Sequence, residues 1–291
     1  MHFLRGSAAF LFIILNTLWV WIPLAFWLLQ RLWTRGAALS RLEKRMDLII
    51  WWWTGNNRRM LDTLGVTAPR IEWHGEQVSF DHWYMVICNH QSWTDILLLQ
   101  CFLRDRIAPL KFFTKAQLIW IPLVGLAMYV LNFPYVKRVS KAQIKANPKL
   151  RNADKENVAR ACMHFKNHPT CVLNFIEGTR RTQEKQTQQN SEFDHLLRPK
   201  IGGLEYVLQD MSSHLHKLLD VTIVYPDGVP TFWEFLQGRA QNVIMEITPH
   251  DIPPEVIVED PVERRAELSA WVKEIWTAKD SRIAHHLKPP R

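Results

Sequence analysis

The sequence has few cysteines and no paired cysteine motif. Only four of its 291 residues are cysteine, and no two form a C-x-x-C arrangement. Zinc sites and disulfide frameworks depend on closely spaced or numerous cysteines, so the sequence predicts neither. All four stand in apolar stretches, a pattern typical of thiols in a reducing compartment. They are Cys88, Cys101, Cys162 and Cys171.

Acidic residues are also scarce relative to basic ones. There are 28 Asp and Glu against 36 Lys and Arg, which gives a formal net charge of +8. This surplus favours an anionic partner, which could be nucleic acid, lipid headgroups or a phosphorylated substrate. We do not expect nucleic acid, because the cations lie largely beside the N-terminal apolar segment and no recognised nucleic-acid motif occurs.

Charge is absent from residues 8–29, which read "AAFLFIILNTLWVWIPLAFWLL". These 22 residues could cross a hydrocarbon core of roughly 30 Å as a helix. Pro23 would bend the helix, so it either spans the membrane or lies within one leaflet. A secretory signal peptide is the alternative, but its apolar core is usually shorter. Seven of the 14 tryptophans fall within the first 53 residues, which supports a membrane-associated N-terminus.

Basic residues crowd the C-terminal flank of this segment, whereas its N-terminal flank has only Arg5. The positive-inside rule then places the rest of the chain on the cytosolic side, of the inner or cytoplasmic membrane if the protein is bacterial. A second, amphipathic helix over about residues 38–61 would lie on the membrane surface or pack on the domain core. We therefore expect an N-terminal membrane region, residues 1–62, followed by a folded domain, residues 63–291, that includes a C-terminal helix.

Strand-like and helix-like stretches alternate from residue 69 onward. This alternation predicts an α/β fold with a mostly parallel sheet flanked by helices. Residues 118–133 are apolar but short, so we expect a core segment or a re-entrant apolar wall. Residues 181–190 are polar without periodicity and predict an exposed loop, and residues 261–280 predict a C-terminal helix. The expected strands are 83–88, 171–176, 221–225 and 243–247, and the expected helices are 94–104, 152–167 and 202–219.

The stretch "VICNHQSWTDILLL" contains a His and an Asp in an H-x4-D arrangement, His90 and Asp95. Ser92 and Asp95 are suited to start a helix by binding its first amides. His90 would emerge at the carboxyl end of a strand, where open α/β sheets bind ligands. If the helix begins at Ser92, Asp95 can reach back and orient His90 as a general base. The spacing alone also fits a structural histidine.

Two further polar stretches follow apolar ones. "CVLNFIEGTRR" leaves a predicted strand at Glu177, after which Gly178 permits a tight turn and Arg180 offers donors suited to phosphate. "FPYVKR" places Lys137 and Arg138 directly after the apolar wall. Such a surface fits an amphiphile with a phosphate head. Solvated surface charges are the alternative for both stretches.

Taken together, these stretches resemble the glycerolipid acyltransferases of the PlsC type, most closely the 1-acylglycerol-3-phosphate (lysophosphatidic acid) acyltransferases. "NHQSWTD", "FPYVKR", "FIEGTR" and "VTIVYP" occur in the order of that family's four sequence blocks, over about residues 83–226. The resemblance implies a glycerol-3-phosphate acyltransferase-like fold and a membrane-bound enzyme. Such an enzyme moves a fatty acyl group from acyl-CoA or acyl carrier protein to a lysophospholipid hydroxyl.

The resemblance further implies 1-acylglycerol-3-phosphate as the acceptor and phosphatidic acid as the product, with another lysophospholipid headgroup as the alternative. It implies no cofactor and no metal, and it makes membrane lipids, and acyl carrier protein if that is the donor, the partners. His90 would be the general base and Asp95 its orienting group, so no nucleophilic Ser or Cys is needed. The other implied site residues are Lys137, Arg138, Glu177, Gly178, Thr179 and Arg180 on the acceptor side, and Lys200, Gly202 and Pro226 on the donor side.

The second block departs from the family pattern, because it reads "LNFPYVKR" where a Gly-x-x-Phe-Ile-x-Arg type is commoner. Two other functions also fit parts of the sequence. A membrane-bound hydrolase or phosphatase would use the same His and Asp on water, and it would need no acyl thioester. A non-catalytic protein that binds anionic lipids would tolerate the loss of His90.

Overall fold

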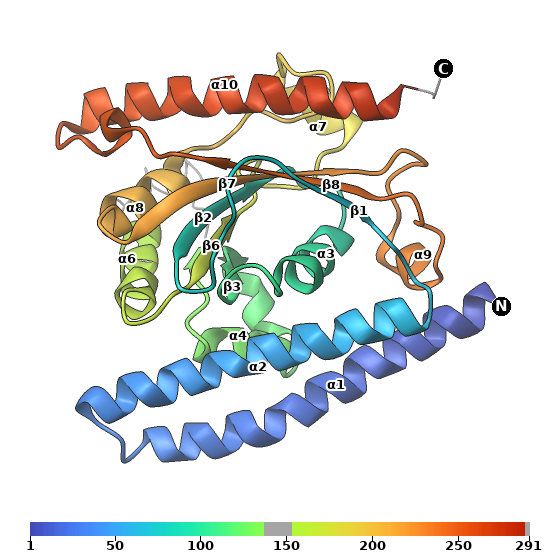
Figure 1. Ribbon diagram of the computed structural model, residues 1–291, viewed down its shortest axis with the longest axis vertical. Coiled ribbons are helices and arrows are strands. Elements are labelled where there is room, and N and C mark those ends of the chain that lie inside the picture. Colours follow the sequence, from blue (N-terminus) through green and yellow to red (C-terminus); the bar gives the residue numbers. More distant parts are fainter. Residues whose placement is uncertain (137–152, 289–291) are drawn as a thin grey trace.

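A six-stranded sheet forms the centre of the computed structural model, which describes residues 1–136 and 153–288 (Figure 1). The sheet order is β1-β8-β7-β2-β6-β3. Helix α10 (Pro261–Leu287) runs along one side of the sheet, and a hairpin of α1 (His2–Arg31) and α2 (Gly36–Thr63) lies on the other side. The strands are β1 (Arg70–Trp73), β2 (Trp83–Cys88), β3 (Leu110–Phe112), β6 (Cys171–Asn174), β7 (Leu215–Val224) and β8 (Ile244–His250).

Strand direction decides which loops meet. β2 pairs in parallel with both β6 and β7, and β3 pairs in parallel with β6. β8 runs antiparallel to β7, and β1 is parallel to β8. The carboxyl ends of β2, β3, β6 and β7 therefore share one edge of the sheet. The predicted α/β fold with a mostly parallel sheet flanked by helices is confirmed.

Each face of the sheet has its own apolar core. Helix α3 (Thr94–Leu103) packs on one face, together with the short α9 (Phe232–Leu236). Helices α6 (Ala153–Phe165), α8 (Gly202–Met211) and α10 cover the other face. Trp276 of α10 is fully buried there, and its indole N–H donates to the Leu197 carbonyl at 3.0 Å. The sheet is thus enclosed on both sides, as its apolar strands require.

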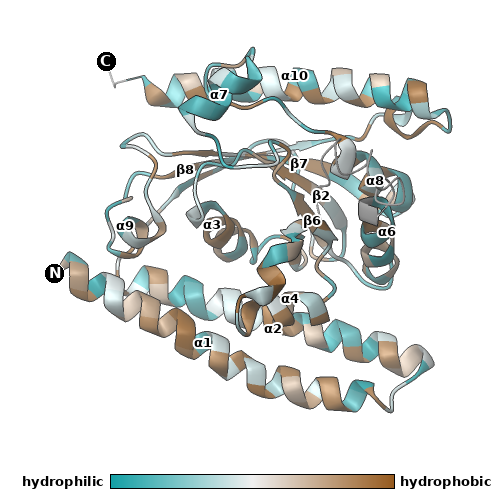
Figure 2. Ribbon diagram, turned by 180° about the vertical axis from the view of Figure 1, so that it is seen from behind, coloured by the Kyte–Doolittle hydropathy of each residue, from teal (hydrophilic) through white to brown (hydrophobic). Residues whose placement is uncertain are grey.

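The two polar residues of the uncharged N-terminal run face α2. Asn16 Nδ2 donates to the Trp53 carbonyl at 2.9 Å and to Asn57 Oδ1 at 3.1 Å. The Trp53 indole N–H donates to Thr17 Oγ1 at 3.0 Å. The opposite side of α1 exposes large apolar side chains, and Figure 2 shows this helix mostly in the hydrophobic colour. α2 packs on the protein through Leu42, Met46, Ile49 and Ile50, while the division of the chain at residue 62 stays a prediction.

Residues 181–190 form helix α7 (Gln183–Gln189), so the predicted exposed loop was wrong. Thr182 caps the helix by accepting from the Lys185 amide at 3.3 Å, and Asn190 ends it in a left-handed conformation with φ of 46°. Gln, Glu and Lys are good helix formers. The helix has no buried residue, which explains why the sequence shows no apolar periodicity there.

The predicted helix over residues 202–219 was too long, because α8 ends at Met211 and β7 starts at Leu215. Several short elements were not predicted at all, since segments of two to seven residues carry little periodicity. The short elements are β1, β3, β4 (Thr114–Lys115), β5 (Tyr135–Val136), the 3₁₀ helices η1 (Ala116–Trp120) and η3 (Pro254–Ile257), and helices α4 (Val124–Val130) and α9. The apolar stretch over residues 118–133 forms the end of η1 and helix α4, and it leaves Trp120, Leu126 and Tyr129 exposed.

A buried ion cluster joins the hairpin to the sheet. Asp47 of α2 lies 2.9 Å from Lys111 Nζ on β3 and 2.7 Å from His168 Nε2. Asp47 is 4% and Lys111 2% exposed. Burial alone would raise the pKa of Asp47, but Lys111 and His168 hold it below its ordinary value. Removing one partner of a buried ion pair leaves the other charge uncompensated, which destabilises the folded protein.

We expect Asp47→Ala to destabilise the fold by about 3–5 kcal/mol, because it leaves the Lys111 ammonium buried without its carboxylate. Chemical denaturation in detergent measures this loss. Asp62→Ala is the matched control on the same helix, since Asp62 is 51% exposed and pairs with Arg58. That exposed pair is worth about 1 kcal/mol or less. Equal losses in the two variants would contradict the role of the buried cluster.

Candidate active site

The structure brings His90 and Asp95 together, as the sequence predicts. β2 ends at Cys88, and the loop that follows carries His90 to the shared edge of the sheet. His90 Nδ1 lies 2.9 Å from Asp95 Oδ2. The amides of Gln91 and Ser92 donate to the same oxygen at 2.6 and 2.9 Å. A carboxylate in the first turn of α3 thus gathers the loop around it, and the helix N-terminus favours its negative charge.

The helix itself starts at Thr94, as expected for residues 94–104, but its N-cap residue is Trp93 and not Ser92. The Ser92 hydroxyl accepts from the Thr94 amide at 3.3 Å and donates to the Pro230 carbonyl at 2.7 Å. The Asp95 carboxylate holds the amides of Gln91 and Ser92, which therefore form a turn ahead of the helix. Asp95 reaches His90 through this turn.

The second nitrogen of His90 is available as a proton acceptor. Because Nδ1 donates to the carboxylate, Nε2 carries the lone pair. Within residues 1–136 and 153–288, no side chain or backbone group hydrogen-bonds to Nε2. The imidazole stacks on the Phe175 ring, with centroids 4.1 Å apart, and the His90 side chain stays 14% exposed. A hydroxyl group can therefore approach Nε2 from outside.

The other Asp95 oxygen is held by a residue that we did not predict. The Tyr225 hydroxyl donates to Asp95 Oδ1 at 2.6 Å and lies 2.7 Å from Thr94 Oγ1. Tyr225 follows β7 directly and is 4% exposed. A sequence signal was present, because Tyr225 is a polar-tipped residue at the end of an apolar strand, within the "VTIVYP" block.

Glu177 connects the first and third sequence blocks. Its carboxylate accepts from the His90 amide at 2.8 Å and from the Leu197 amide at 2.9 Å. Burial raises the pKa of Glu177 to about 8. The Arg181 amide donates to the His90 carbonyl at 2.7 Å, so the two blocks are tied together from both sides. In this arrangement Glu177 holds the backbone of His90.

The remaining acceptor-side residues lie around this junction. Arg180 is exposed, and its guanidinium carbon lies 5.1 Å from the centre of the Trp93 ring. Thr179 Oγ1 accepts from Lys185 Nζ at 2.9 Å. Gly178 has φ of 73°, a conformation that favours glycine. The predicted roles of Lys137 and Arg138 cannot be placed, because both residues lie outside the described ranges.

The predicted donor-side residues lie at the same edge of the sheet. The Lys200 amide donates to the Ile176 carbonyl at 2.6 Å, and the Lys200 side chain lies over Gly178. Gly202 is the first residue of α8, and Pro226 follows Tyr225 at the end of β7. The structure therefore groups these residues with the third block. Their part in donor binding stays a prediction.

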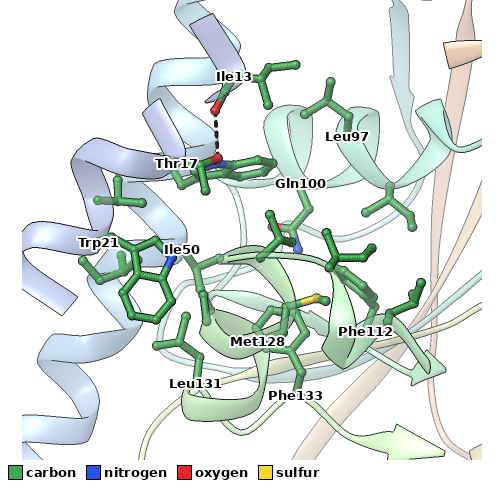
Figure 3. Close-up of a pocket in the computed structure, with 18 of the residues that line it drawn as sticks. Ile13, Thr17, Trp21, Ile50, Leu97, Gln100, Phe112, Met128, Leu131 and Phe133 are labelled. Carbon is green, nitrogen blue, oxygen red and sulfur yellow. Dashed lines mark hydrogen bonds between the residues drawn. The ribbon is translucent and has the colours of Figure 1, made fainter. Parts of the chain in front are cut away.

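An apolar cavity of about 420 Å³ lies next to the His90 loop (Figure 3). Trp93, three residues after His90, is part of its wall. The buried amide of Gln100 is satisfied, since Nε2 donates to the Leu110 carbonyl at 2.8 Å. The stretch over residues 118–133 supplies one wall, in line with the predicted apolar wall. Other lining residues are Ile13, Thr17, Trp21, Leu24, Ile50, Trp53, Leu97, Phe112, Met128, Leu131 and Phe133.

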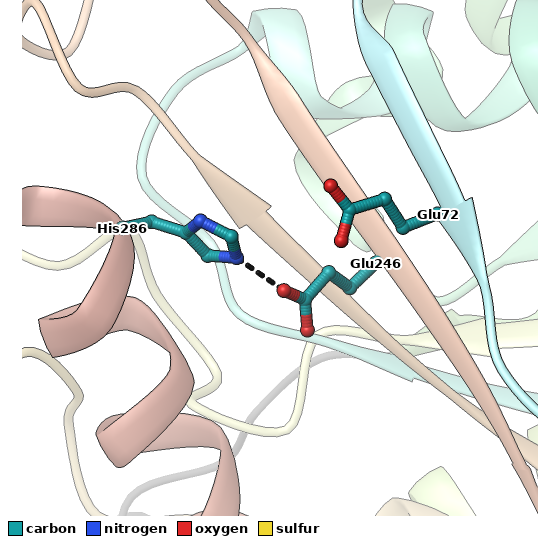
Figure 4. Close-up of side chains that lie close together, drawn as sticks. All are labelled: Glu72, Glu246 and His286. Carbon is teal, nitrogen blue, oxygen red and sulfur yellow. Dashed lines mark hydrogen bonds and ion pairs between the residues drawn. The ribbon is translucent and has the colours of Figure 1, made fainter. Parts of the chain in front are cut away.

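A second cluster of titratable side chains lies on β1, β8 and α10 (Figure 4). Glu72, Glu246 and His286 place ligand-type atoms within 4.8 Å of one another. Arg70 Nε lies 2.7 Å from Glu72 Oε1, and Arg282 Nε lies 3.4 Å from Glu246 Oε2. These guanidinium groups already balance the two carboxylates and would repel a bound cation. We interpret the cluster as an ion network that fastens α10 to the sheet.

The raised pKa of Glu177 predicts a pH-dependent stability. Between its ordinary value of 4.5 and about 8, the folded protein retains a proton that the unfolded chain has lost. Unfolding then releases a proton, so the contribution of Glu177 to stability falls as pH rises through this window. We expect the stability of the wild type relative to Glu177→Gln to decrease across it.

Chemical denaturation of both proteins at a series of pH values measures this difference. Glu192→Gln, at an exposed position on the same side of the molecule as α7, is the control. Its stability should follow the wild type throughout the range. Parallel curves for wild type and Glu177→Gln would contradict the burial of a protonated Glu177.

The sequence is similar to a family of acyltransferases and to several individual acyltransferases. The family model "Acyltransferase" matches residues 70–226. Lysophosphatidylinositol acyltransferase 10 of Caenorhabditis elegans is 25% identical over 256 residues, which cover 81% of this chain and 60% of that protein. The 1-acyl-sn-glycerol-3-phosphate acyltransferase epsilon of Mus musculus is 24% identical, over 77% of this chain and 63% of that protein. The chain thus spans about 60% of the length of the curated relatives it matches.

A solved structure shares the fold. The crystal structure of the 1-acyl-sn-glycerophosphate acyltransferase PlsC from Thermotoga maritima aligns with a TM-score of 0.54. The alignment covers 96% of this chain and 98% of that chain at 20% sequence identity. At this identity the likeness shows a common architecture.

Proposed function

Because the chain belongs to the acyltransferase family, we propose that it transfers a fatty acyl group from a thioester to a hydroxyl of a lysophospholipid. The observation that carries this proposal is the position of His90. Its Nδ1 is held by Asp95 at 2.9 Å, its side chain is 14% exposed, and Trp93 of the same loop lines an apolar cavity of about 420 Å³. A base and a site for an acyl chain therefore adjoin.

The geometry supports a direct transfer without an acyl-enzyme. His90 Nε2 takes the proton of the acceptor hydroxyl as the oxygen attacks the thioester carbonyl carbon. Asp95 stabilises the imidazolium that forms. The carbon–sulfur bond then breaks, the new ester is released, and the proton passes from His90 to the leaving thiolate. All four cysteines are buried in the structure, so none is placed to act as a nucleophile.

The site offers an apolar cavity for the acyl chain of an amphiphilic substrate and a cation, Arg180, for its phosphate. An acyl chain fits the cavity, whose volume falls in the usual range for ligand sites of about 300–1,000 Å³. Arg180 is exposed beside Trp93 and offers a guanidinium fork to a phosphate. Trp93 contacts both regions. The reactive hydroxyl of a lysophospholipid lies between its chain and its phosphate. With the chain in the cavity and the phosphate at Arg180, we propose that this hydroxyl meets His90.

We propose 1-acylglycerol-3-phosphate as the acceptor and phosphatidic acid as the product, with acyl-CoA or acyl carrier protein as the donor. A second acceptor is favoured by the names of two relatives. The Caenorhabditis elegans protein is a lysophosphatidylinositol acyltransferase, and a Saccharomyces cerevisiae protein, 24% identical, is a 2-acyl-1-lysophosphatidylinositol acyltransferase. An inositol headgroup would extend past Arg180 into solvent.

We expect His90→Ala to lower the rate of thiol release by at least about 100-fold, because the acceptor hydroxyl loses its base. The assay uses purified protein in detergent and crosses lysophosphatidic acid and lysophosphatidylinositol with acyl-CoA and acyl carrier protein donors. His285→Ala, at an exposed histidine on α10, should retain full activity.

The assay also separates the proposed transferase from its rivals. A transferase releases thiol only when the acceptor is present. Release of thiol without acceptor would indicate a hydrolase, and full activity of a folded His90→Ala protein would remove the role assigned to His90. If the wild type binds anionic vesicles but turns over no donor and acceptor pair, the non-catalytic alternative stands.

We also propose that α1 lies in one leaflet and does not cross the membrane. By length and composition, α1 is the one helix within the described residues that could span a bilayer. It contacts the rest of the protein along its whole length, however. His2 Nδ1 lies 2.9 Å from the Gln237 carbonyl, the Trp21 indole donates to the Leu123 carbonyl, and Arg31 pairs with Glu43. Glu43 belongs to α2, which is itself tied to β3 through Asp47 and Lys111. A spanning helix could not keep both of its ends against the same side of the protein.

This topology places both ends of α1 on the same, cytosolic side of the membrane. A single cysteine introduced before Met1, or in place of Arg35 after α1, should therefore react with a membrane-impermeant thiol reagent from that side. The wild-type protein is the control, because its four native cysteines are buried. Labelling of the two positions from opposite sides would show that α1 spans the bilayer.

A further inference from the structure

We propose that Tyr225 is a positioning residue of the catalytic pair, whose buried hydroxyl, held by Thr94, fixes the Asp95 carboxylate that orients His90. This inference rests on the proposed acyl transfer. Tyr225 contacts no substrate in the proposed reaction. The two oxygens of Asp95 bind different partners. Oδ2 takes His90 and the loop amides, whereas Oδ1 takes the Tyr225 hydroxyl at 2.6 Å.

The fold places Tyr225 accurately. β7 lies beside β2, and Asn89, the residue after β2, clamps the two strand ends together. Asn89 Nδ2 donates to the Ile223 carbonyl at 2.8 Å, and the Ile223 amide donates to Asn89 Oδ1 at 2.9 Å. Tyr225 is two residues beyond this clamp. Its ring joins the apolar core on the α3 side of the sheet, so the hydroxyl meets α3 at Thr94 and Asp95.

The direction of the hydrogen bonds is determined by chemistry. An ionised carboxylate only accepts, so the single proton of the Tyr225 hydroxyl is donated to Asp95 Oδ1. Thr94 Oγ1 must then donate to the Tyr225 oxygen, across 2.7 Å. Burial and the nearby Asp95 raise the pKa of Tyr225 well above its ordinary value, so the hydroxyl keeps its proton. The result is a fixed chain from Thr94 through Tyr225 and Asp95 to His90.

Loss of the hydroxyl would change the charge distribution of the Asp95 carboxylate. Oδ1 would be buried without a donor. More of its negative charge would also fall on Oδ2, which would stabilise the protonated imidazole. His90 would then become protonated at a higher pH than in the wild type. The titratable and charged groups that act on this region are Asp95, Glu177, Cys88, Tyr225, Asp220 and Lys279.

The first test is Tyr225→Phe, assayed with the donor and acceptor pair that the wild type uses best. We expect kcat to fall about 10- to 100-fold, the loss of one hydrogen bond to a charged group. KM for both substrates should stay within about threefold, because Tyr225 lies behind Asp95. The rise of kcat with pH should move upward by about half a unit or more.

Tyr84→Phe is the matched control. Tyr84 is 2% exposed, and its hydroxyl accepts from the Ser79 amide at 2.9 Å, near the amino end of β2. This variant also loses a buried tyrosine hydrogen bond, so it should lose stability but keep the wild-type kcat and pH profile. Thr94→Val should lower kcat less than Tyr225→Phe does. The double variant should be no slower than Tyr225→Phe, because Thr94 acts through Tyr225.

The role of Tyr225 can also be tested without catalytic turnover, so that the result does not depend on the proposed acyl transfer. The imidazole titration of His90 is followed by NMR in detergent micelles with labelled histidine, and the signal is assigned with His90→Ala. The midpoint should move to higher pH in Tyr225→Phe and stay in place in Tyr84→Phe. An unchanged midpoint, or a Tyr225→Phe enzyme with the wild-type kcat and pH profile, would overturn the role of Tyr225. A wild type without thiol release would overturn the proposed function, while the titration would still decide whether Tyr225 holds the pair.

Discussion

The buried carboxylate of Asp95 is the constraint on which the site depends. A buried charge is costly unless hydrogen bonds compensate it. Asp95 has such compensation from His90, from the amides of Gln91 and Ser92, and from Tyr225. Three of these donors belong to the loop after β2 and the fourth follows β7, so satisfying one carboxylate shapes the loop, aligns the imidazole and fixes the end of β7. The local structure of the site follows from this single requirement.

Strand direction extends the same logic to the whole sheet. β2, β6 and β7 point the same way, so the residues that follow them meet at one edge. Asn89 ties the β2 end to β7, and Glu177 ties the β6 end to the backbone of His90. β8 runs the other way, and its carboxyl end lies at the opposite edge. The sequence blocks that are separated by up to about 130 residues along the chain are adjacent for this reason.

Sequence patterns predicted the α/β fold and the contact of His90 with Asp95, because both depend on residues that are close in the sequence. Apolar runs identify strands, and a five-residue spacing across a strand-to-helix turn can be closed locally. The contacts of Tyr225 and Glu177 could not be predicted, since they depend on the register of strands far apart in sequence. Helix α7 was missed because it buries no residue. The cavity was missed because the residues that line it are spread along the chain from Ile13 to Phe232.

The apolar and polar halves of the site are joined by one side chain. Trp93 lines the cavity on one side and lies under the Arg180 guanidinium on the other, three residues after His90. Helix α1 closes the cavity with Ile13, Val20 and Leu24, while its opposite side exposes large apolar residues. Under the proposed function, the same helix would face an acyl chain inside and lipid outside. A lysophospholipid would keep its chain in apolar surroundings on both sides of α1, and only its hydroxyl and phosphate would have to reach His90 and Arg180.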